Sequence, residues 1–345
     1  MRLSGIDILL HDHLDGSYPL LSILPELWRK THEDGREYPA AEHRWEDHHG
    51  WVKRWFNDAH RNIVEKFSLT TEVMQDVDTL FLAGKTYTEM RARQGFRYCE
   101  ARIAPQYHTK LGLTEKQVMD ALIRGIKRGE LNYPGIEVNL ILSIGREVSP
   151  DRACDLTGVT AECDRAYVPG IDLVCYEPSD PPEKFKKAYI LAKLFRLKTT
   201  CHAGEWVTDT KNFLEDIPLL LKNIRMAVFE LNVNRIGHAT ALAYDPKLIS
   251  HIVARGIGIE GCPGSNLLTG AIPHVSLLKI RELLNAGVLY SMSPDDDLFL
   301  PDMDETFLIC NDFYKFTNEE KAKLRLNAWK TRFGNRKPIP EDIVL

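Results

Sequence analysis

Short apolar segments recur along the chain, and most of them are followed directly by polar, ionisable residues. We interpret eight of these segments as buried strands: residues 6–10, 96–103, 138–143, 171–174, 197–201, 235–238, 257–260 and 288–292. Apolar runs of this length are typical of strands in a parallel sheet, which helices cover on both faces. Amphipathic segments with helix start signals, such as the capping box of Thr114 and Gln117, fill most of the intervals.

The alternation of strands and helices predicts an α/β fold. Eight β–α units favour one TIM (β/α)8 barrel domain over residues 1–345, and a doubly wound open sheet is the alternative. Residues 17–97 interrupt the alternation, and we interpret them as a helical, lid-bearing insertion after the first strand. Within it, Trp51, Trp55 and Phe56 lie at helical spacing. They favour a helix that packs on the core, and the alternative is a flap whose aromatic side chains touch a ligand.

Composition gives no support for several classes of partner. The chain has 44% hydrophobic residues, enough for a large core, and 44 Lys+Arg against 49 Asp+Glu, a net charge of −5. This balance offers no electrostatic basis for binding nucleic acid or an anionic membrane. We see neither a secretory signal nor an apolar run long enough to span a bilayer. Seven cysteines without a Cys-x-x-Cys pair fit a reducing compartment, so we expect a cytoplasmic protein of unknown oligomeric state.

The polar residues that follow the strands are candidates for a shared site. His11 and His13 follow the first strand, and in an extended chain they point to the same face. Other strands are followed by His202, Glu205, His238, Asp295 and Asp296. Each taken alone has an ordinary interpretation, as a core histidine or a solvated turn. In a barrel, however, the residues after every strand gather at one mouth, which is where such enzymes place their chemistry.

Three histidines and one aspartate suit a particular kind of metal. The nitrogen-rich set of His11, His13, His202 and Asp295 suits Zn²⁺ better than Mg²⁺ or Ca²⁺, and Fe²⁺, Co²⁺ or Mn²⁺ remain alternatives. Zinc lowers the pKa of a water ligand to about 7. The neighbouring groups then acquire possible roles: Glu205 as a proton donor, His238 as the group that orients or deprotonates water, and Asp296 as a hydrogen-bond acceptor.

Seven short motifs, in order along the chain, resemble the adenosine deaminase family. They are His-Asp-His-Leu-Asp-Gly (11–16), Tyr-Cys-Glu-Ala-Arg-Ile-Ala-Pro (98–105), Gly-Ile-Asp-Leu (170–173), His-Ala-Gly-Glu (202–205), Arg-Ile-Gly-His (235–238), Glu-Gly-Cys-Pro-Gly-Ser-Asn (260–266) and Asp-Asp (295–296). The resemblance implies a zinc-dependent barrel enzyme, with one zinc per chain held by the four residues above, that replaces the 6-amino group of a purine with oxygen.

The resemblance also implies a role for each remaining candidate. Glu205 would protonate purine N1, His238 would position and deprotonate water, and Asp296 would bond N7 and the water. Asp15 would contact the ribose, which favours a nucleoside over free adenine. Cys175 stands where the family has a glycine whose backbone N–H faces purine N3, and Ser-Pro-Asp-Asp-Asp (293–297) stands for the family's Asn-Thr-Asp-Asp-Pro. We therefore expect adenosine or a 5′-modified adenosine as the substrate, and an inosine-type product and ammonia.

Two other functions remain as alternatives. The first is a barrel hydrolase with one or two metals that cleaves an amide or ester. Many such enzymes bridge two metals with a lysine after the fourth strand, and residues 172–175 contain none. The second is a non-catalytic nucleoside-binding or interaction protein, which we expect to lack a catalytic group, whereas Glu205, His238 and Asp295 are all present.

Overall fold

The computed structural model describes residues 4–31, 38, 47–58, 63–208 and 212–343. The strands are β1 (Ile8–His13), β2 (Tyr98–Ile103), β3 (Glu137–Gly145), β4 (Gly170–Val174), β5 (Lys198–Thr199), β6 (His202–Ala203), β7 (Arg235–His238), β8 (Gly258–Gly261) and β9 (Leu289–Met292). The helices are α1 (Leu24–Thr31), α2 (His48–Asn57), α3 (Ile63–Thr71), α4 (Val77–Arg93), α5 (Glu115–Asn132), α6 (Pro150–Glu162), α7 (Lys186–Leu194), α8 (Phe213–Arg225), α9 (Pro246–Arg255), α10 (Pro263–Leu268), α11 (Ile280–Asn285), α12 (Met303–Tyr314) and α13 (Asn318–Thr331). Short 3-10 turns η1 (Tyr18–Ser22), η3 (Pro105–His108), η4 (Pro182–Phe185), η6 (Leu242–Tyr244) and η7 (Val275–Leu278), and the π-helical η5 (Met226–Leu231), complete the described elements.

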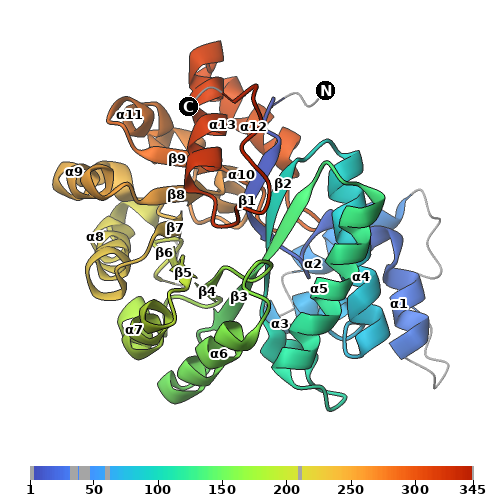
Figure 1. Ribbon diagram of the computed structural model, residues 1–345. Helices are drawn as coiled ribbons and strands as arrows, with labels where there is room; N and C mark the ends of the chain where they lie inside the picture. Colours follow the sequence, from blue (N-terminus) through green and yellow to red (C-terminus); the bar gives the residue numbers. More distant parts are fainter. Residues whose placement is uncertain (1–3, 32–37, 39–46, 59–62, 209–211, 344–345) are drawn as a thin grey trace.

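The strands form a parallel barrel in chain order, surrounded by helices (Figure 1). β5 and β6 are two parts of one strand, because the two residues that separate them also bond to the neighbouring strands. The Thr200 N–H donates to the Ile171 carbonyl of β4 (3.0 Å), and the Cys201 carbonyl accepts the Gly237 N–H of β7 (2.9 Å). A parallel bridge between Asp12 and Asp295 joins the two ends of the ring. The predicted TIM barrel is confirmed, and all strand ends that carry candidate residues face the same mouth.

Paired charges fill the centre of the barrel where apolar layers are more usual. The network consists of Arg102 and Arg235 with Glu100, Asp172 and Glu260, all buried. Arg102 Nε donates to Asp172 Oδ2 (2.5 Å), and Arg235 Nε donates to Glu260 Oε1 (2.5 Å). Arg102 also pairs with Glu260, and Arg235 with Glu100. Two guanidinium groups against three carboxylates leave an excess of negative charge beneath the mouth.

Helices α1 to α4 belong to the insertion after β1, and two of them pack beside the mouth. Phe56 of α2 stacks on Phe299, with ring centroids 4.4 Å apart, and Phe67 of α3 meets Phe299 edge-on at 5.4 Å. Trp51 and Trp55 are partly buried against the core, so the prediction that this helix packs on the core is confirmed. Phe299 follows Asp296 closely, and α2 and α3 therefore lie next to the segment that carries two candidate residues.

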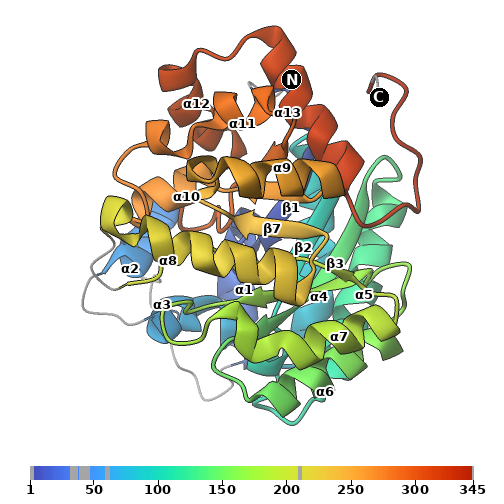
Figure 2. The same cartoon turned by 90° about the vertical axis from the view of Figure 1, so that its left-hand side faces the viewer.

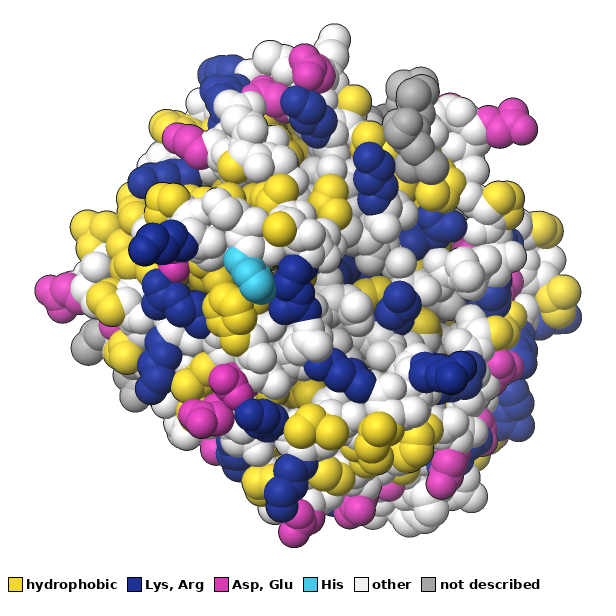
Figure 3. Space-filling model, turned by 60° about the vertical axis from the view of Figure 1, so that its left-hand side comes forward, with side chains coloured by type: hydrophobic (Ala, Val, Ile, Leu, Met, Phe, Trp, Pro, Cys, Tyr) yellow, Lys and Arg dark blue, Asp and Glu magenta, His cyan; other side chains and the backbone are white. Residues whose placement is uncertain are grey.

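The outer helices present a mixed surface. On the face shown in Figure 3, basic, acidic and apolar side chains are interspersed. Among the exposed apolar residues are Leu194 of α7, Leu214 of α8 and Phe229 of η5, and Figure 2 shows α7, α8 and α9 on one side of the barrel. Within the described residues, no helix combines the length and the apolar character that crossing a membrane requires.

Candidate metal and catalytic site

Four predicted ligands meet at the mouth of the barrel. His11 and His13 come from β1, His202 from β6, and Asp295 from the loop after β9. Asp295 Oδ1 lies 3.3 Å from the Nε2 atoms of both His11 and His13, and the Nε2 atoms of His13 and His202 are 3.3 Å apart. One ligand atom from each of the four lies within 4.8 Å of the others. Residues separated by nearly three hundred positions thus aim their donor atoms at one point.

Carboxylates from the barrel centre lie against the far nitrogens of two of these imidazoles. His11 Nδ1 lies 3.0 Å from Glu260 Oε2, and His202 Nδ1 lies 3.1 Å from Asp172 Oδ2. Arg102 contacts both carboxylates, so one guanidinium links the supports of two histidines. A carboxylate on the far nitrogen fixes a histidine's ring orientation and tautomer and is a common feature of metal sites.

The charge states of the histidines suit a cation at this point. Burial lowers the pKa of His13 to about 3 and also lowers the pKa of His202, which favours the neutral imidazoles that bind metals. For His11, burial and Arg102 lower the pKa, but the adjacent carboxylates of Asp295 and Glu260 outweigh them and the pKa is raised. The carboxylates around His11 therefore favour a positive charge, which a proton or a metal cation can supply.

The donor set fits a zinc ion. His11 Nε2 is buried and makes no hydrogen bond, although it points toward the other three donor atoms. An unpaired buried nitrogen costs free energy unless a cation or another partner meets it. Three imidazole nitrogens and one carboxylate oxygen form a set that tetrahedral zinc accepts.

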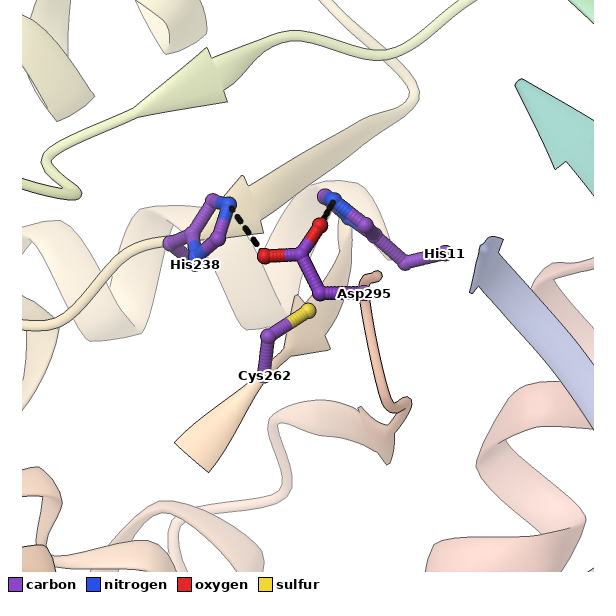
Figure 4. Close-up of side chains that lie close together, drawn as sticks. All are labelled: His11, His238, Cys262 and Asp295. Atoms are coloured by element: carbon purple, nitrogen blue, oxygen red, sulfur yellow. Dashed lines mark ion pairs between the residues drawn. The ribbon is translucent and has the colours of Figure 1, made fainter. Parts of the chain in front are cut away.

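A second group of four residues shares two members with the first. Figure 4 shows Asp295 between His11 and His238, with the Cys262 thiol beside it. A thiol must lose its proton to bind a metal well. Burial, and then the charge of Asp295, raise the pKa of Cys262 well above its usual value, which favours the protonated thiol. We therefore retain His202 and His13 as the better partners of His11 and Asp295.

The candidate catalytic groups lie beside this cluster. His238 Nε2 lies 3.7 Å from Glu205 Oε2 and 4.0 Å from Asp295 Oδ2. Asn266 Nδ2 contacts His238 Nδ1 at 2.9 Å, and burial lowers the pKa of His238 well below its usual value. A neutral imidazole can accept a proton, as a general base must. Burial, reinforced by the adjacent Asp295, raises the pKa of Asp296 well above its usual value.

Backbone conformation at the mouth is unusual in the way functional sites often are. Cys175 and Asp295 follow β4 and β9, His238 is the last residue of β7, and all three have positive φ (77°, 77° and 64°). Such conformations cost roughly 1–3 kcal/mol each and persist where the surroundings enforce them. Two glycines serve close packing here. A Cβ at Gly16 would lie 1.7 Å from Asp296 Oδ1, and one at Gly237 would lie 2.9 Å from His11 Cε1.

The two remaining predicted residues lie on the same rim. Asp15 follows β1, and its Oδ2 lies 3.8 Å from the buried Nε2 of His108. Cys175 follows β4, and its Sγ lies 3.4 Å from the hydroxyl of Tyr107. All the sequence-predicted site residues therefore come from segments at the carboxyl ends of strands.

Sequence reasoning missed the residues that support the site. Glu260, Asp172 and Asn266 stand in the quoted motifs but were assigned no role. Ser265, whose hydroxyl donates to Asp295 Oδ2 (2.7 Å), also stands in a quoted motif without an assigned role. Glu177, which accepts the backbone N–H groups of Gly204 (2.8 Å) and Glu205 (3.0 Å), follows Cys175 closely in a stretch that suggested no contact.

Comparison with known proteins identifies the family. The family model described as adenosine deaminase matches residues 7–338. The chain belongs to the adenosine deaminase family. The resemblance drawn from the motifs is confirmed, and the chain is an enzyme of a metal-dependent family of hydrolytic deaminases that act on C–N bonds.

Individual relatives are similar to this chain over most of its own length. An adenosine deaminase of Clostridium acetobutylicum is 28% identical over 288 residues, which cover 83% of this chain and 80% of the relative. Among solved structures, an adenine deaminase from Arthrobacter aurescens has a TM-score of 0.77 at 24% identity, covering 96% of this chain and 95% of that one. An amidohydrolase from Burkholderia ambifaria with bound Zn has a TM-score of 0.78 at 20% identity, covering 98% and 87%. At these identities the solved structures support the fold alone.

Proposed function

We propose that the protein is a zinc-dependent aminohydrolase that converts adenosine, or a 5′-modified adenosine, to the inosine-type product and ammonia. The observation that carries the proposal is the position of Glu205 and His238, whose side chains approach to 3.7 Å beside the cluster of His11, His13, His202 and Asp295. A proton donor, a base and a metal-binding set at one mouth are the groups that hydrolytic deamination requires.

Zinc, when bound, acts as a Lewis acid and makes water a better nucleophile at neutral pH. The chain's own residues position the water and the purine and transfer the protons. His238 holds the attacking water and takes its proton, since its Nε2 is buried and makes no hydrogen bond. Glu205 gives a proton to purine N1, which makes C6 more electrophilic. Asp296, with its raised pKa, bonds purine N7 and the water.

The rim residues support a nucleoside substrate. Asp15 would accept hydrogen bonds from ribose hydroxyls, which free adenine lacks. The backbone N–H of Cys175 takes the place of the family's glycine N–H toward purine N3, while its thiol adds bulk beside Tyr107. Because of this bulk, the proposed substrates include both adenosine and 5′-modified adenosines.

Helices α2 and α3, packed on Phe299, would serve as the cover of this mouth. The seven free cysteines support a reducing compartment such as the cytoplasm.

A substrate panel tests the proposal. Purified protein loaded with zinc is mixed with adenosine, deoxyadenosine, adenine and 5′-substituted adenosines, and the change in purine absorbance and the release of ammonia are followed. We expect turnover of a nucleoside, with about one metal per chain. Hydrolysis of an amide or ester with about two metals per chain would favour the rival hydrolase. Nucleoside binding without any product would favour the non-catalytic alternative.

A further inference from the structure

A buried aspartate separates the two histidines of β1. In an extended strand, alternate side chains point to opposite faces, so Asp12 points away from the side that His11 and His13 share. Asp12 is fully buried and meets α4, the helix that precedes β2. The hydroxyl of Tyr87 and the guanidinium of Arg91 (Nη2 to Oδ1, 2.9 Å) both donate to it. These two residues are four apart on α4 and therefore share one helix face.

The same guanidinium also holds the loop after β9. Arg91 Nη1 donates to Asp297 Oδ2 (2.7 Å), and Nη2 donates to Asp297 Oδ1 (2.9 Å), a bidentate pair in which both side chains are almost fully buried. Bidentate pairs of this kind fix geometry as well as charge. Asp297 Oδ1 also accepts the backbone N–H of Tyr18 (2.6 Å). Asp297 is two residues beyond Asp295, and it stands where the resembling family motif has proline.

Arg91 thus spans the seam at which the barrel closes. The backbone hydrogen bonds across this seam include the two of the Asp12–Asp295 bridge, in which the His13 N–H donates to the Asp295 carbonyl (3.0 Å) and the Asp295 N–H donates to the His11 carbonyl (3.2 Å). Beyond the bridge, the Leu298 N–H donates to the Gly16 carbonyl (2.9 Å). This is a short ladder, and three of the four metal-binding residues lie on it. A rotation or slip of one side of the seam would move Asp295 relative to both histidines of β1.

We propose that Arg91 is a positioning residue that clamps the two halves of the metal site through Asp12 and Asp297. Asp12 fixes the strand that carries His11 and His13, Asp297 fixes the loop that carries Asp295, and one rigid guanidinium sets the distance between them. The inference rests on the proposed metal-binding role of His11, His13 and Asp295, and it adds the residues that hold those ligands in register.

The test measures zinc affinity rather than activity. Apoprotein is titrated with zinc against a chelator of known affinity, for wild type, Arg91→Lys, Arg91→Met and Asp297→Asn, and circular dichroism checks that each variant is folded. We expect Arg91→Met to weaken zinc binding by about 10–100-fold, the usual effect of removing a residue that orients ligands. We expect Arg91→Lys, which keeps the charge but loses the fork, to fall between Arg91→Met and wild type.

A matched control removes an arginine at the other end of β1. Arg325 binds Asp7, which immediately precedes β1, through two hydrogen bonds of 2.9 and 2.8 Å. Arg325→Met should lower thermal stability and leave zinc affinity within about twofold of wild type. A merely structural role for Arg91 predicts the same outcome for Arg91→Met.

Each result decides a different question. If wild type binds zinc but Arg91→Met and Asp297→Asn bind it equally well, the clamp is wrong while the proposed function stands. If Arg91→Met does not fold, because it leaves two buried carboxylates unpaired, Asp297→Asn decides, since it leaves the pair of Arg91 with Asp12 intact. We expect a several-fold loss of affinity in that variant, and an unchanged affinity overturns the proposal. A wild-type protein that binds no zinc overturns the proposed function itself.

Discussion

Glu177 holds the loop that carries Glu205, and the substitution Glu177→Gln tests how far the reaction depends on that loop. The Glu177 carboxylate is buried and accepts three hydrogen bonds. Its Oε1 accepts from the Gly204 N–H (2.8 Å) and from Asn223 Nδ2 (2.9 Å), and its Oε2 accepts from the Glu205 N–H (3.0 Å). Because Glu205 lies in this loop, its carboxylate is positioned by the bonds that its own backbone makes.

Glutamine keeps the shape of Glu177 but replaces one acceptor oxygen with an NH₂ group. If the remaining oxygen occupies the Oε1 position, the NH₂ group faces the Glu205 N–H, donor against donor. One orphaned buried donor costs about 1–3 kcal/mol, and the other two bonds weaken because the acceptor is no longer charged. We therefore expect a total penalty of about 3 kcal/mol, which equals roughly 10²-fold in rate if all of it falls on the transition state. Since part of this penalty lowers the free energy of unfolding rather than raising the barrier, kcat should fall by about 10–100-fold.

Initial rates of adenosine deamination, with thermal unfolding and metal content measured on the same samples, check this prediction. Glu130→Gln is the matched control. Glu130 of α5 also accepts a backbone N–H, that of Val138 (2.8 Å), and pairs with Arg336. Val138 lies at the start of β3, at the end of the barrel away from the mouth. This control should lose stability and keep its kcat. A folded Glu177→Gln protein with wild-type kcat, or an equal loss in Glu130→Gln, would refute the reasoning.

Three further substitutions probe single groups at the mouth. Glu205→Gln should lower turnover by about 10²–10⁴-fold while metal content stays at the wild-type level, and full activity in this variant would remove Glu205 from the reaction. Cys175→Gly should raise the free energy of unfolding, measured in urea, by about 0.5–1 kcal/mol, because removing the backbone strain at a φ of 77° outweighs the entropy cost of glycine. A loss of stability would show that the thiol contact with Tyr107 matters more than the strain. Gly16→Ala should lower kcat by at least about tenfold, because its Cβ would displace the Asp296 carboxyl and each 1.4 kcal/mol is tenfold in rate, and unchanged kinetics would mean that Asp296 can move freely.

The sequence allowed the barrel and most of the mouth to be predicted because both follow from local patterns. Apolar runs mark parallel strands, and the topology then brings their carboxyl ends together wherever they lie in the chain. That step placed His11, His202 and Asp295 at one site without any contact information. Helix α6 was not predicted. Its buried face contains Thr157 and Thr160 besides Ala153 and Leu156, so its apolar period is weak.

The supporting residues could not be predicted because their partners are fixed only by the fold. Glu260 and Arg102 stand on strands where a charged residue is as easily interpreted as exposed. Their burial follows from the inward direction of both side chains at the barrel centre, which no local pattern reveals. The role of Asp297 could not be predicted either. A triplet of aspartates usually indicates a solvated turn, and only the pairing with Arg91, a residue distant in the sequence, gives Asp297 a role.

The central claim is that His11, His13, His202 and Asp295 together hold one metal ion per chain. The most direct test is the metal content of purified protein after equilibration with zinc and removal of free metal, for wild type and for His202→Ala. The account predicts about one zinc per wild-type chain and a substoichiometric amount in the folded variant. Equal zinc content in both proteins, or no zinc in either, would contradict it.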